Sequence, residues 1–187
     1  MKVVIVGGVA GGASTAARLR RLDEQADIVV LERGEQVSYA NCGLPYHIGG
    51  VIKKRDALFV QTPGKLRLIL KIDVRIRSEA IAIDQARKTI RIRDEKTGEE
   101  YDESWDKLVL CPGSRPADLG VPGEDLPGVY HLHTVADMDA IKKSIDTGAK
   151  RAIVVGGGFI GVELAENLRE CNLHVDLIEK SDRYVVL

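Results

Sequence analysis

The sequence has few cysteines and few aromatic residues, and it lacks a long apolar run. Its 187 residues include three cysteines, one tryptophan, two phenylalanines and five tyrosines. Cys42, Cys111 and Cys171 are too scattered to form a disulfide framework or a zinc pattern. No apolar run approaches the ~20 residues that a membrane-spanning helix needs. These absences exclude a disulfide-stapled scaffold, a cysteine zinc module and a helical membrane protein.

Neither sign of charge dominates the sequence. It carries 27 basic and 28 acidic residues, a formal net charge of −1, so composition gives no bias toward nucleic acid or a membrane. Met1 and Lys2 lead directly into the apolar stretch Val3–Val6, which leaves no room for a secretory signal. We therefore expect a cytoplasmic protein with a small-molecule partner, without nucleic-acid or membrane binding.

A glycine-rich turn follows the first apolar stretch. Residues 2–6 predict a buried strand, residues 11–22 a helix, and residues 28–32 a second strand that ends in Glu32. The turn needs small residues because the backbone must bend tightly and approach a pyrophosphate at the helix N-terminus. Glu32 is placed to accept hydrogen bonds from ribose hydroxyls. Val9 replaces the usual middle glycine. The whole pattern predicts a dinucleotide-binding unit. The turn comprises Gly7, Gly8, Val9, Ala10, Gly11 and Gly12.

The same pattern recurs near the C-terminal end of the sequence. A strand at 151–155 precedes a full G-x-G-x-x-G, a helix to about residue 170 and a strand at 175–179. Glu179 at the end of that strand favours the free ribose of NADH, but Lys180 and Arg183 could tolerate a 2′-phosphate, so the choice of cofactor stays open. Two such units predict two nucleotides. The second turn is Gly156, Gly157, Gly158, Phe159, Ile160 and Gly161.

Cys42 comes soon after the first unit, within Ser38-Tyr39-Ala40-Asn41-Cys42-Gly43-Leu44-Pro45-Tyr46-His47. If Asn41 caps a helix beginning near Cys42, the helix dipole favours the thiolate and makes Cys42 a candidate redox centre. The alternative is a small buried cysteine in an ordinary loop. No second cysteine stands nearby, and position 47 holds His47, a candidate for proton transfer. A redox-active Cys42 would therefore pair with a small thiol or become a sulfenic acid.

The remaining segments complete an α/β fold class. Residues 62–71 and 135–147 predict helices capped by Thr62 and Thr134, and residues 107–111 predict a buried strand. Segments 74–83, 89–93 and 100–105 predict a small antiparallel β-meander beside the parallel sheet. His131 and His133 are expected on a strand with two polar faces rather than at a metal, and no metal site is predicted.

These segments predict two Rossmann-like units, the second of them truncated because the sequence stops after its second strand. The expected domains are 1–112, a linker and helix at 113–149, and the start of a second nucleotide domain at 150–187.

The motif SYANCGLPY, preceded by VVIVGGVAGG, resembles the single-cysteine branch of the FAD-dependent pyridine nucleotide–disulfide oxidoreductases. The likeness is to coenzyme A-disulfide reductases and to related NADH oxidases, peroxidases and persulfide reductases. The resemblance implies that the first unit binds the ADP part of FAD and the second binds NADH or NADPH. It further implies that electrons pass through FAD to Cys42 and then to a disulfide such as coenzyme A disulfide.

The resemblance also implies roles for particular residues. Phe159 corresponds to the aromatic residue that covers the flavin, with core packing as its structural alternative, and Glu163 to the carboxylate near the nicotinamide, with a solvated helix face as its alternative. Ala80 lies in the segment that touches adenine, and Gly113 in the turn that closes the FAD site. The expected cofactor contacts are Gly7, Val9, Ala10, Gly11, Gly12, Glu32, Arg33, Ala80, Gly113, Gly156, Gly158, Phe159, Ile160, Gly161, Glu163 and Glu179.

Catalysis is assigned to Cys42, Asn41 and His47, and substrate binding to Arg18, Arg21, Ser38, Asn41 and Cys42. Arg18 and Arg21 suit nucleotide phosphates, although a charged helix face is usually only solvated.

The resemblance implies that full-length relatives continue into further domains and form homodimers. Two alternatives stay open: oxygen, peroxide or a persulfide as the electron acceptor, and an inactive nucleotide-binding fragment.

Overall fold

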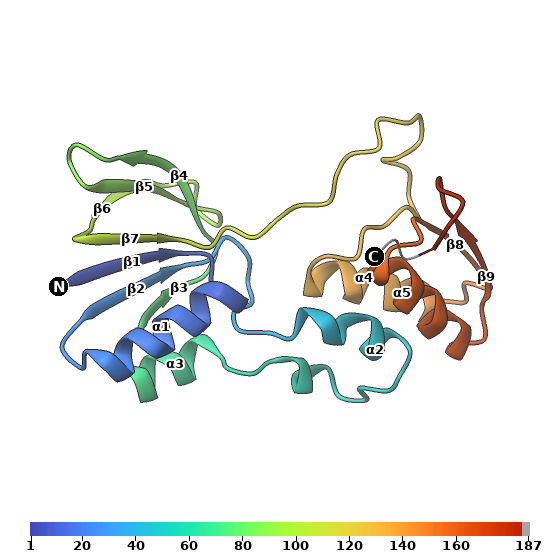
Figure 1. Cartoon of the computed structure of the whole chain (residues 1–187), viewed down its shortest axis with the longest axis horizontal. Coiled ribbons are helices and arrows are strands. Elements are labelled where there is room, and N and C mark those ends of the chain that lie inside the picture. The colour runs from blue at the N-terminus through green and yellow to red at the C-terminus, as the bar shows by residue number, and fades with distance from the viewer. Residues whose placement is uncertain (185–187) are drawn as a thin grey trace. The chain divides into compact units, whose positions relative to one another are not determined.

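The computed structural model describes residues 1–184 and divides the chain into two compact units (Figure 1). The first unit combines Met1–Tyr39 with Phe59–Ser114, and the second combines Ala40–Leu58 with the chain from Arg115 onward. The segment that carries Cys42 thus groups with the second nucleotide unit, whereas the sequence placed it in a domain of residues 1–112. Both glycine turns lie in parallel α/β structure, as the sequence predicts.

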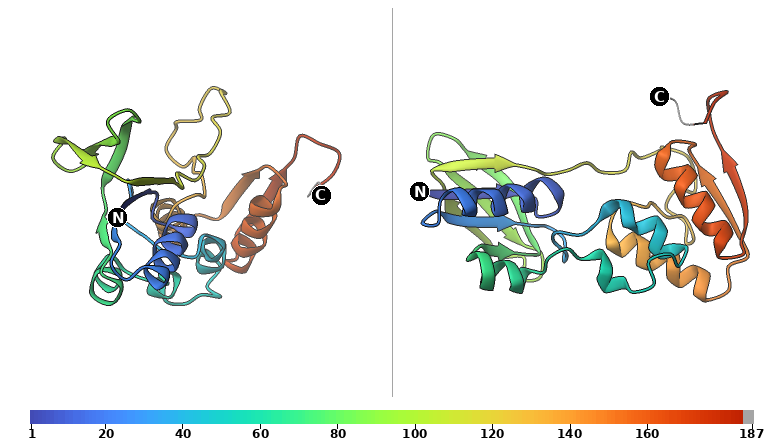
Figure 2. Two further views of the ribbon diagram at one scale, coloured as in Figure 1. Left: turned by 60° about the vertical axis from the view of Figure 1, so that its left-hand side comes forward. Right: turned by 60° about the horizontal axis from the view of Figure 1, so that its bottom comes forward.

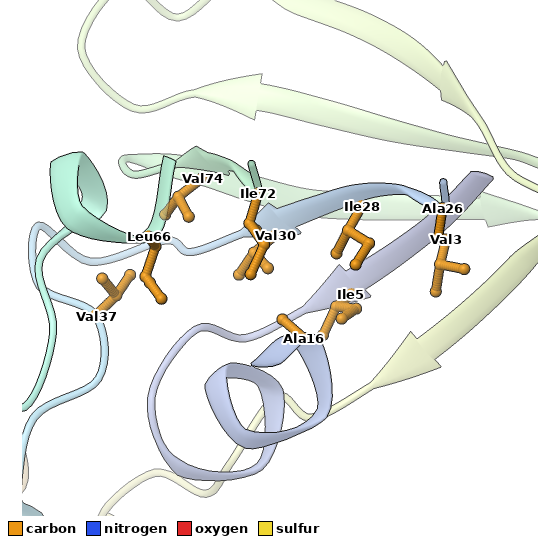
Figure 3. Packing of buried hydrophobic residues seen from close by; sticks show 10 residues of the cluster. All are labelled: Val3, Ile5, Ala16, Ala26, Ile28, Val30, Val37, Leu66, Ile72 and Val74. Atoms are coloured by element: carbon orange, nitrogen blue, oxygen red, sulfur yellow. The ribbon is translucent and has the colours of Figure 1, made fainter. Parts of the chain in front are cut away.

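The first unit is built on a parallel sheet of four strands in the order β3-β2-β1-β7. Two helices, α1 and α3, pack on one face of the sheet, where the apolar side chains shown in Figure 3 form one cluster. Gly12, Ala13 and Ala16 are buried in α1, and these small residues let the helix approach the sheet closely. The elements are β1 (Lys2–Val6), α1 (Ala10–Leu22), β2 (Asp27–Leu31), α3 (Pro63–Leu70), β3 (Asp73–Arg75) and β7 (Lys107–Leu110).

A three-stranded antiparallel sheet covers the other face of the parallel sheet (Figures 1 and 2). It contains β4 (Ser78–Asp84), β5 (Thr89–Asp94) and β6 (Glu100–Ser104). Along β5, Ile90 and Ile92 are fully buried while the residues between them face outward, which is the alternation expected of a half-buried strand. The predicted antiparallel meander is therefore present in the first unit.

The second unit holds a parallel pair of strands, β8 (Arg151–Val155) and β9 (His174–Ile178), with α5 (Phe159–Glu170) between them in sequence. Its other helices are α4 (Val135–Asp146) and α2 (Leu44–Ile48), which contacts both α4 and α5 (Figure 2). Short 3₁₀ turns, Asn41–Gly43 and Arg55–Leu58, flank α2. The predicted cap of α4 is confirmed: Thr134 and Asp137 form a reciprocal capping box.

Polar contacts fix the segment Ala40–Leu58 within the second unit. Arg55 makes a forked ion pair with Asp139 of α4, with donor–acceptor distances of 2.9 and 2.7 Å. The thiol of Cys171, at the end of α5, donates to the carbonyl of Ile48 at 3.2 Å. Ile48 is itself fully buried. The segment is thus packed as part of the second unit.

Several local predictions were wrong. The expected strand 74–83 is two strands, because the chain turns at Arg77 with φ of 54° and enters a different sheet. No glycine or proline marks this turn. His131 and His133 lie in irregular structure rather than on a strand.

A charge cluster joins the two sheets of the first unit, and it predicts a pH-dependent stability. Glu103 of β6 is paired with Lys2 of β1 and with Arg75 of β3, the latter at 2.6 Å, and its side chain is only 13% exposed. Burial alone would raise the pKa of Glu103, but hydrogen bonds from Lys2 and Arg75 outweigh burial and hold it below the ordinary value of 4.5. Stability from this lowered pKa is present above pH 4.5 and is lost as pH falls through the folded-state pKa.

We therefore expect Glu103→Gln to lower the free energy of unfolding by about 1–3 kcal/mol at pH 7, because it leaves two partly buried cations unpaired. Urea unfolding at several pH values measures this, and the deficit should shrink below pH 4. Glu100→Gln is the matched control on the same strand. Its pair with Arg93 is exposed and should contribute less than about 1 kcal/mol. Equal losses in the two variants would contradict a special role for Glu103.

Candidate functional site

The first glycine turn is closed by contacts that only glycine permits. Gly7 has φ of +93°, and its amide donates to the carbonyl of Leu31 at 2.8 Å. A Cβ added to Gly12 would lie 1.7 Å from the carbonyl oxygen of Gly7. Val9 stands where the usual motif has its middle glycine. It occupies the N-cap position of α1 and makes no capping hydrogen bond through its side chain. The turn therefore keeps the form that the glycines predict despite Val9.

Glu32 is held in place by the backbone on either side of it. Its carboxylate accepts a hydrogen bond from the amide of Gly8 at 2.7 Å and another from the amide of Gly34 at 2.7 Å. A carboxylate offers about four acceptor positions, so these two bonds leave room for hydroxyl donors. We call this arrangement the carboxylate clamp: an acid at a strand end, bonded to the second glycine of the turn and to an amide two residues further on.

The second turn repeats the first in detail. Gly156 has φ of +106° and donates to the carbonyl of Ile178 at 2.8 Å, and a Cβ on Gly161 would lie 1.9 Å from the oxygen of Gly156. Glu179 forms the same carboxylate clamp, accepting from the amides of Gly157 at 2.5 Å and Ser181 at 2.8 Å. The bonds from Ser181 and Gly157 hold the pKa of Glu179 below its ordinary value, so the carboxylate is ionised at neutral pH.

The residues at the start of α5 face solvent. Phe159 and Ile160 are 61% and 62% exposed. Core packing, which was the structural alternative for Phe159, is therefore wrong. Gly158 is extended at the N-cap, and a Cβ there would meet nothing within 4 Å. Glu163 is half-buried, and its backbone carbonyl accepts from the side chain of Asn167 at 2.8 Å. The surface next to the second turn is thus open to a ligand.

The residues present fit two dinucleotides. Each glycine turn exposes backbone that is not covered by side chains, which suits a pyrophosphate. The clamped carboxylate beside each turn suits a ribose. In the first unit Ala80 borders a shallow apolar hollow of about 330 Å³, and Gly113 is exposed with φ of +72°. Arg33 forms an exposed ion pair with Glu79 at 3.6 Å. The hollow is lined by Val6, Ala80, Ile81, Ala82, Ile83, Leu110 and Pro112.

Cys42 lies on the surface of the second unit as a free thiol. It is the middle residue of the 3₁₀ turn Asn41–Gly43, which runs directly into α2. The chain turns inward at Gly43, where a Cβ would come within 2.7 Å of Leu58, and this leaves Cys42 facing out. The alternative of a buried packing cysteine is therefore wrong. Asn41 is exposed and is not a cap: Ala40 holds that place, without a side-chain bond.

His47 is buried, with 7% of its surface exposed. Its Nδ1 lies 2.6 Å from the carbonyl oxygen of Ile52, and because a carbonyl oxygen can only accept, Nδ1 donates this hydrogen bond. This bond ties the end of α2 to the following loop. The structure thus gives His47 a local structural role, and its part in proton transfer stays a prediction.

The predicted substrate residues lie in both units. Arg18 and Arg21 are exposed on α1. Ser38 adopts a left-handed backbone with φ of 49°; its amide donates to the carbonyl of Gly8 at 2.9 Å and its own carbonyl accepts from Val60 at 2.8 Å. These three belong to the first unit, and Asn41 and Cys42 to the second. Their shared role in substrate binding stays a prediction.

Sequence reasoning did not single out Arg20, which lies in the last turn of α1. Its guanidinium donates to the carbonyls of Leu70 at 2.7 Å and Lys71 at 3.0 Å, and to those of Asp23 and Glu24 at the end of its own helix. A basic residue in the last turn of a helix is suited to cap free carbonyls, which is a signal that was available. Arg20 thus secures the ends of α1 and α3 together.

Cys111 follows the last residue of β7 and contacts the first glycine turn. Its amide donates to the carbonyl of Val6 at 2.7 Å, and its own carbonyl oxygen would lie 1.9 Å from a Cβ on Gly7. The end of β7 therefore forms one wall of the first glycine turn. No local sequence pattern could reveal this contact, because it joins residues that are distant in the chain.

Two further findings concern residues 1–184 only. Within this range, no group of three or more histidine, cysteine, aspartate or glutamate side chains is arranged to hold a metal ion. None of the helices in the same range combines the length and the apolar character that crossing a membrane requires.

Two dinucleotide turns, each with a carboxylate clamp, and an exposed free cysteine define a candidate redox protein that uses two nucleotide cofactors. The sequence profile of the pyridine nucleotide-disulphide oxidoreductases matches residues 1–186, and the chain belongs to that family. The enzymes of this family depend on FAD and on NADH or NADPH.

Individual relatives point the same way. The coenzyme A disulfide reductase of Staphylococcus aureus (strain JH9) is 40% identical over 183 residues, which cover 97% of this chain and 41% of that protein. The structure is similar to reduced Bacillus anthracis CoADR-RHD, with 48% identity and a TM-score of 0.96, covering 98% of this chain and 33% of that one. The chain thus spans about two fifths of the curated relatives.

Two further solved structures broaden the range of activities. An NAD-dependent persulfide reductase from A. fulgidus is 38% identical with a TM-score of 0.95, covering 99% of this chain and 34% of that one. A water-forming NADH oxidase from Lactobacillus brevis, bound to NADH, is 32% identical with a TM-score of 0.93, covering 98% and 40%. One scaffold therefore carries several electron acceptors.

Proposed function

We propose that the protein takes electrons from NADH or NADPH and delivers them through Cys42 to a small-molecule disulfide of the coenzyme A type. The observation that carries this proposal is the exposed free thiol of Cys42 in a chain with two clamped dinucleotide turns. The names of the S. aureus and B. anthracis relatives support the substrate class. A homodimer is part of the proposal, by resemblance to full-length members of the family.

The chemistry at sulfur follows from ordinary thiol–disulfide exchange. The thiolate of Cys42 attacks one sulfur of the substrate, forms a mixed disulfide and releases the first thiol. Two electrons and a proton must then arrive to free Cys42 and release the second thiol. Bound FAD would supply the relay by which the hydride of NAD(P)H becomes that electron pair. One NAD(P)H and one proton are consumed for each disulfide, and two thiols are formed.

The chain's own residues have distinct parts in this scheme. The turn from Gly7 to Gly12 and the clamped Glu32 would hold the ADP part of FAD, with Ala80, Arg33 and Gly113 at its margins. The turn from Gly156 to Gly161 would hold NAD(P)H, with Phe159 and Glu163 next to the reacting rings. Arg18, Arg21, Ser38 and Asn41 are proposed as substrate contacts, and His47 as a proton carrier, on the family resemblance and the residue chemistry.

A second candidate keeps the scaffold and changes the acceptor. The persulfide reductase and the NADH oxidase are similar to this chain over nearly its whole length, which supports a persulfide, oxygen or peroxide as the acceptor. Cys42 would then cycle through a persulfide or a sulfenic acid.

An acceptor assay on the whole native protein tests these alternatives. NADH or NADPH is supplied with coenzyme A disulfide in the absence of oxygen, and free thiol is measured. Oxygen uptake, peroxide loss and sulfide release are then measured with each other acceptor. We expect two thiols for each nicotinamide oxidised. Turnover confined to another acceptor would reject the disulfide proposal, and none with any acceptor would favour a nucleotide-binding protein without chemistry.

A further inference from the structure

We propose that Arg55 is a positioning residue for Cys42. Its ion pair with Asp139 of α4 fixes the 3₁₀ turn Arg55–Leu58, and that turn contacts the backbone on both sides of Cys42. The inference rests on the proposed function of Cys42 in disulfide reduction. It assigns Arg55 an effect on that reaction through its neighbours, without contact between Arg55 and the sulfur.

Helix α4 provides a firm support for the ion pair. The capping box of Thr134 and Asp137 fixes the start of this helix, and Met138 and Ile141 are buried. Asp139 directly follows Met138 in the sequence. Its carboxylate is therefore carried by a segment whose position is set by close packing in the core.

The ion pair has the geometry that fixes orientation as well as distance. Nε and Nη2 of Arg55 donate to the two carboxylate oxygens of Asp139 at 2.9 and 2.7 Å. Two parallel bonds restrain a planar guanidinium in a way that a lysine ammonium cannot match. The side chains are 40% and 43% exposed, so solvent weakens the attraction. A forked arginine–carboxylate pair is nevertheless the kind of exposed ion pair that contributes measurably.

The far end of the same 3₁₀ turn contacts the backbone around Cys42. The carbonyl of Leu58 accepts a hydrogen bond from the amide of Ala40 at 2.8 Å. The side chain of Leu58 is fully buried and lies against Gly43, where a Cβ would come within 2.7 Å of it. The amide of Gly43 in turn donates to the carbonyl of Ala40 at 2.9 Å. Leu58 thus contacts the residues that enclose Asn41 and Cys42.

These contacts predict which reaction step depends on Arg55. Arg55 and Leu58 are the first and last residues of one short turn, so loss of the ion pair frees Leu58 to move. Thiol–disulfide exchange requires the attacking sulfur in a defined place, and a displacement of about 1 Å can slow a reaction by up to 10²-fold. Electron transfer that bypasses Cys42 has no such requirement. A variant at Arg55 should therefore separate the two.

Amide hydrogen exchange on the whole native protein tests the positioning without turnover. In Arg55→Ala we expect the amides of Ala40 and Gly43 to exchange about five- to tenfold faster, on the scale of one forked ion pair. Asp139→Ala should give the same increase. The double variant should give no further increase, because each change removes the same interaction.

Asp146→Ala is the matched control, because Asp146 lies on the same helix and forms an exposed ion pair with Lys142 at 3.2 Å. Exchange at Ala40 and Gly43 should stay native in this variant. Native exchange at those amides in Arg55→Ala, or the same acceleration in Asp146→Ala, would overturn the inference.

Steady-state kinetics on the same variants provides the second readout. With coenzyme A disulfide we expect the turnover number to fall about tenfold in Arg55→Ala, and less in Arg55→Lys, which keeps the charge without the fork. Reduction of ferricyanide by NADH or NADPH needs no thiol and should keep its native rate. Equal loss of both activities, or native disulfide turnover, would contradict a positioning role. If the native protein itself lacked disulfide turnover, the proposed function would fail, and hydrogen exchange would still decide whether Arg55 fixes the turn.

Discussion

Replacing Cys42 by serine is expected to abolish disulfide reduction while FAD stays bound. The hydroxyl of serine is similar in size, but it does not ionise near neutral pH and cannot form a mixed disulfide. We expect the turnover number to fall by roughly 10⁴-fold or more, as it does when a covalent nucleophile is removed from other enzymes. FAD is assigned to the first glycine turn, which this substitution does not touch, so the purified variant should still contain flavin in the native amount, as measured by its visible absorbance.

Cys171→Ser is the control for this experiment. Its thiol donates to the carbonyl of Ile48 at 3.2 Å, and a serine hydroxyl can donate the same bond. The variant should keep native turnover. A second readout is alkylation of the native protein by iodoacetamide, which should modify exposed Cys42 first and stop turnover. Undiminished turnover of Cys42→Ser would remove this sulfur from the mechanism.

Alanine in place of the last glycine of either turn, Gly12 or Gly161, is expected to abolish binding of one nucleotide and to leave binding of the other unchanged. In Gly12→Ala the new methyl group would lie 1.7 Å from the carbonyl oxygen of Gly7, and in Gly161→Ala 1.9 Å from that of Gly156. Backbone must move to relieve such contacts, at an expected loss of about 3 kcal/mol or more. Gly12→Ala should lose FAD, whereas Gly161→Ala should keep flavin and lose calorimetric binding of NAD⁺.

Gly64→Ala is the control for both variants. Gly64 lies in the first turn of α3, and a Cβ there would meet nothing within 4 Å. Alanine is the better helix former, so this change should leave both nucleotides bound and raise stability by roughly 0.5–1 kcal/mol. If Gly12→Ala kept its flavin and its stability, the close packing of the first turn against Gly7 would be refuted.

Local sequence patterns predicted the backbone form of the two glycine turns well, because the constraint on that form is local. Gly7 and Gly12 are needed by the turn itself, and the same spacing in Gly156 and Gly161 produces the same backbone bonds. The strand-end position of Glu32 was also predictable from its place in the pattern. The fold class is confirmed for the same reason: strand, turn and helix signals follow one another at the spacing of a nucleotide-binding unit.

Features that depend on tertiary contacts were not predictable. The expected cap at Asn41 is absent because the 3₁₀ turn begins at Asn41 itself, which leaves Ala40 in the cap position. The break between β3 and β4 at Arg77 is not marked by a glycine or a proline. A hydrogen bond from the amide of Arg77 to the carbonyl of Gly34, at 3.0 Å, helps to fix the turn instead. The wall that Cys111 forms against Gly7 joins segments about a hundred residues apart. Sequence patterns do not encode such pairings.

The grouping of Ala40–Leu58 with the second unit also has a consequence for how the chain is made. Leu44, Ile48 and Leu58 are fully or almost fully buried, and α2 contacts α4 and α5, which are translated much later. At roughly 5–20 residues per second, the ribosome completes α5 several seconds after Leu58 has been added. This apolar segment therefore waits without its neighbours during synthesis, and the nascent chain is most in need of a chaperone in that interval.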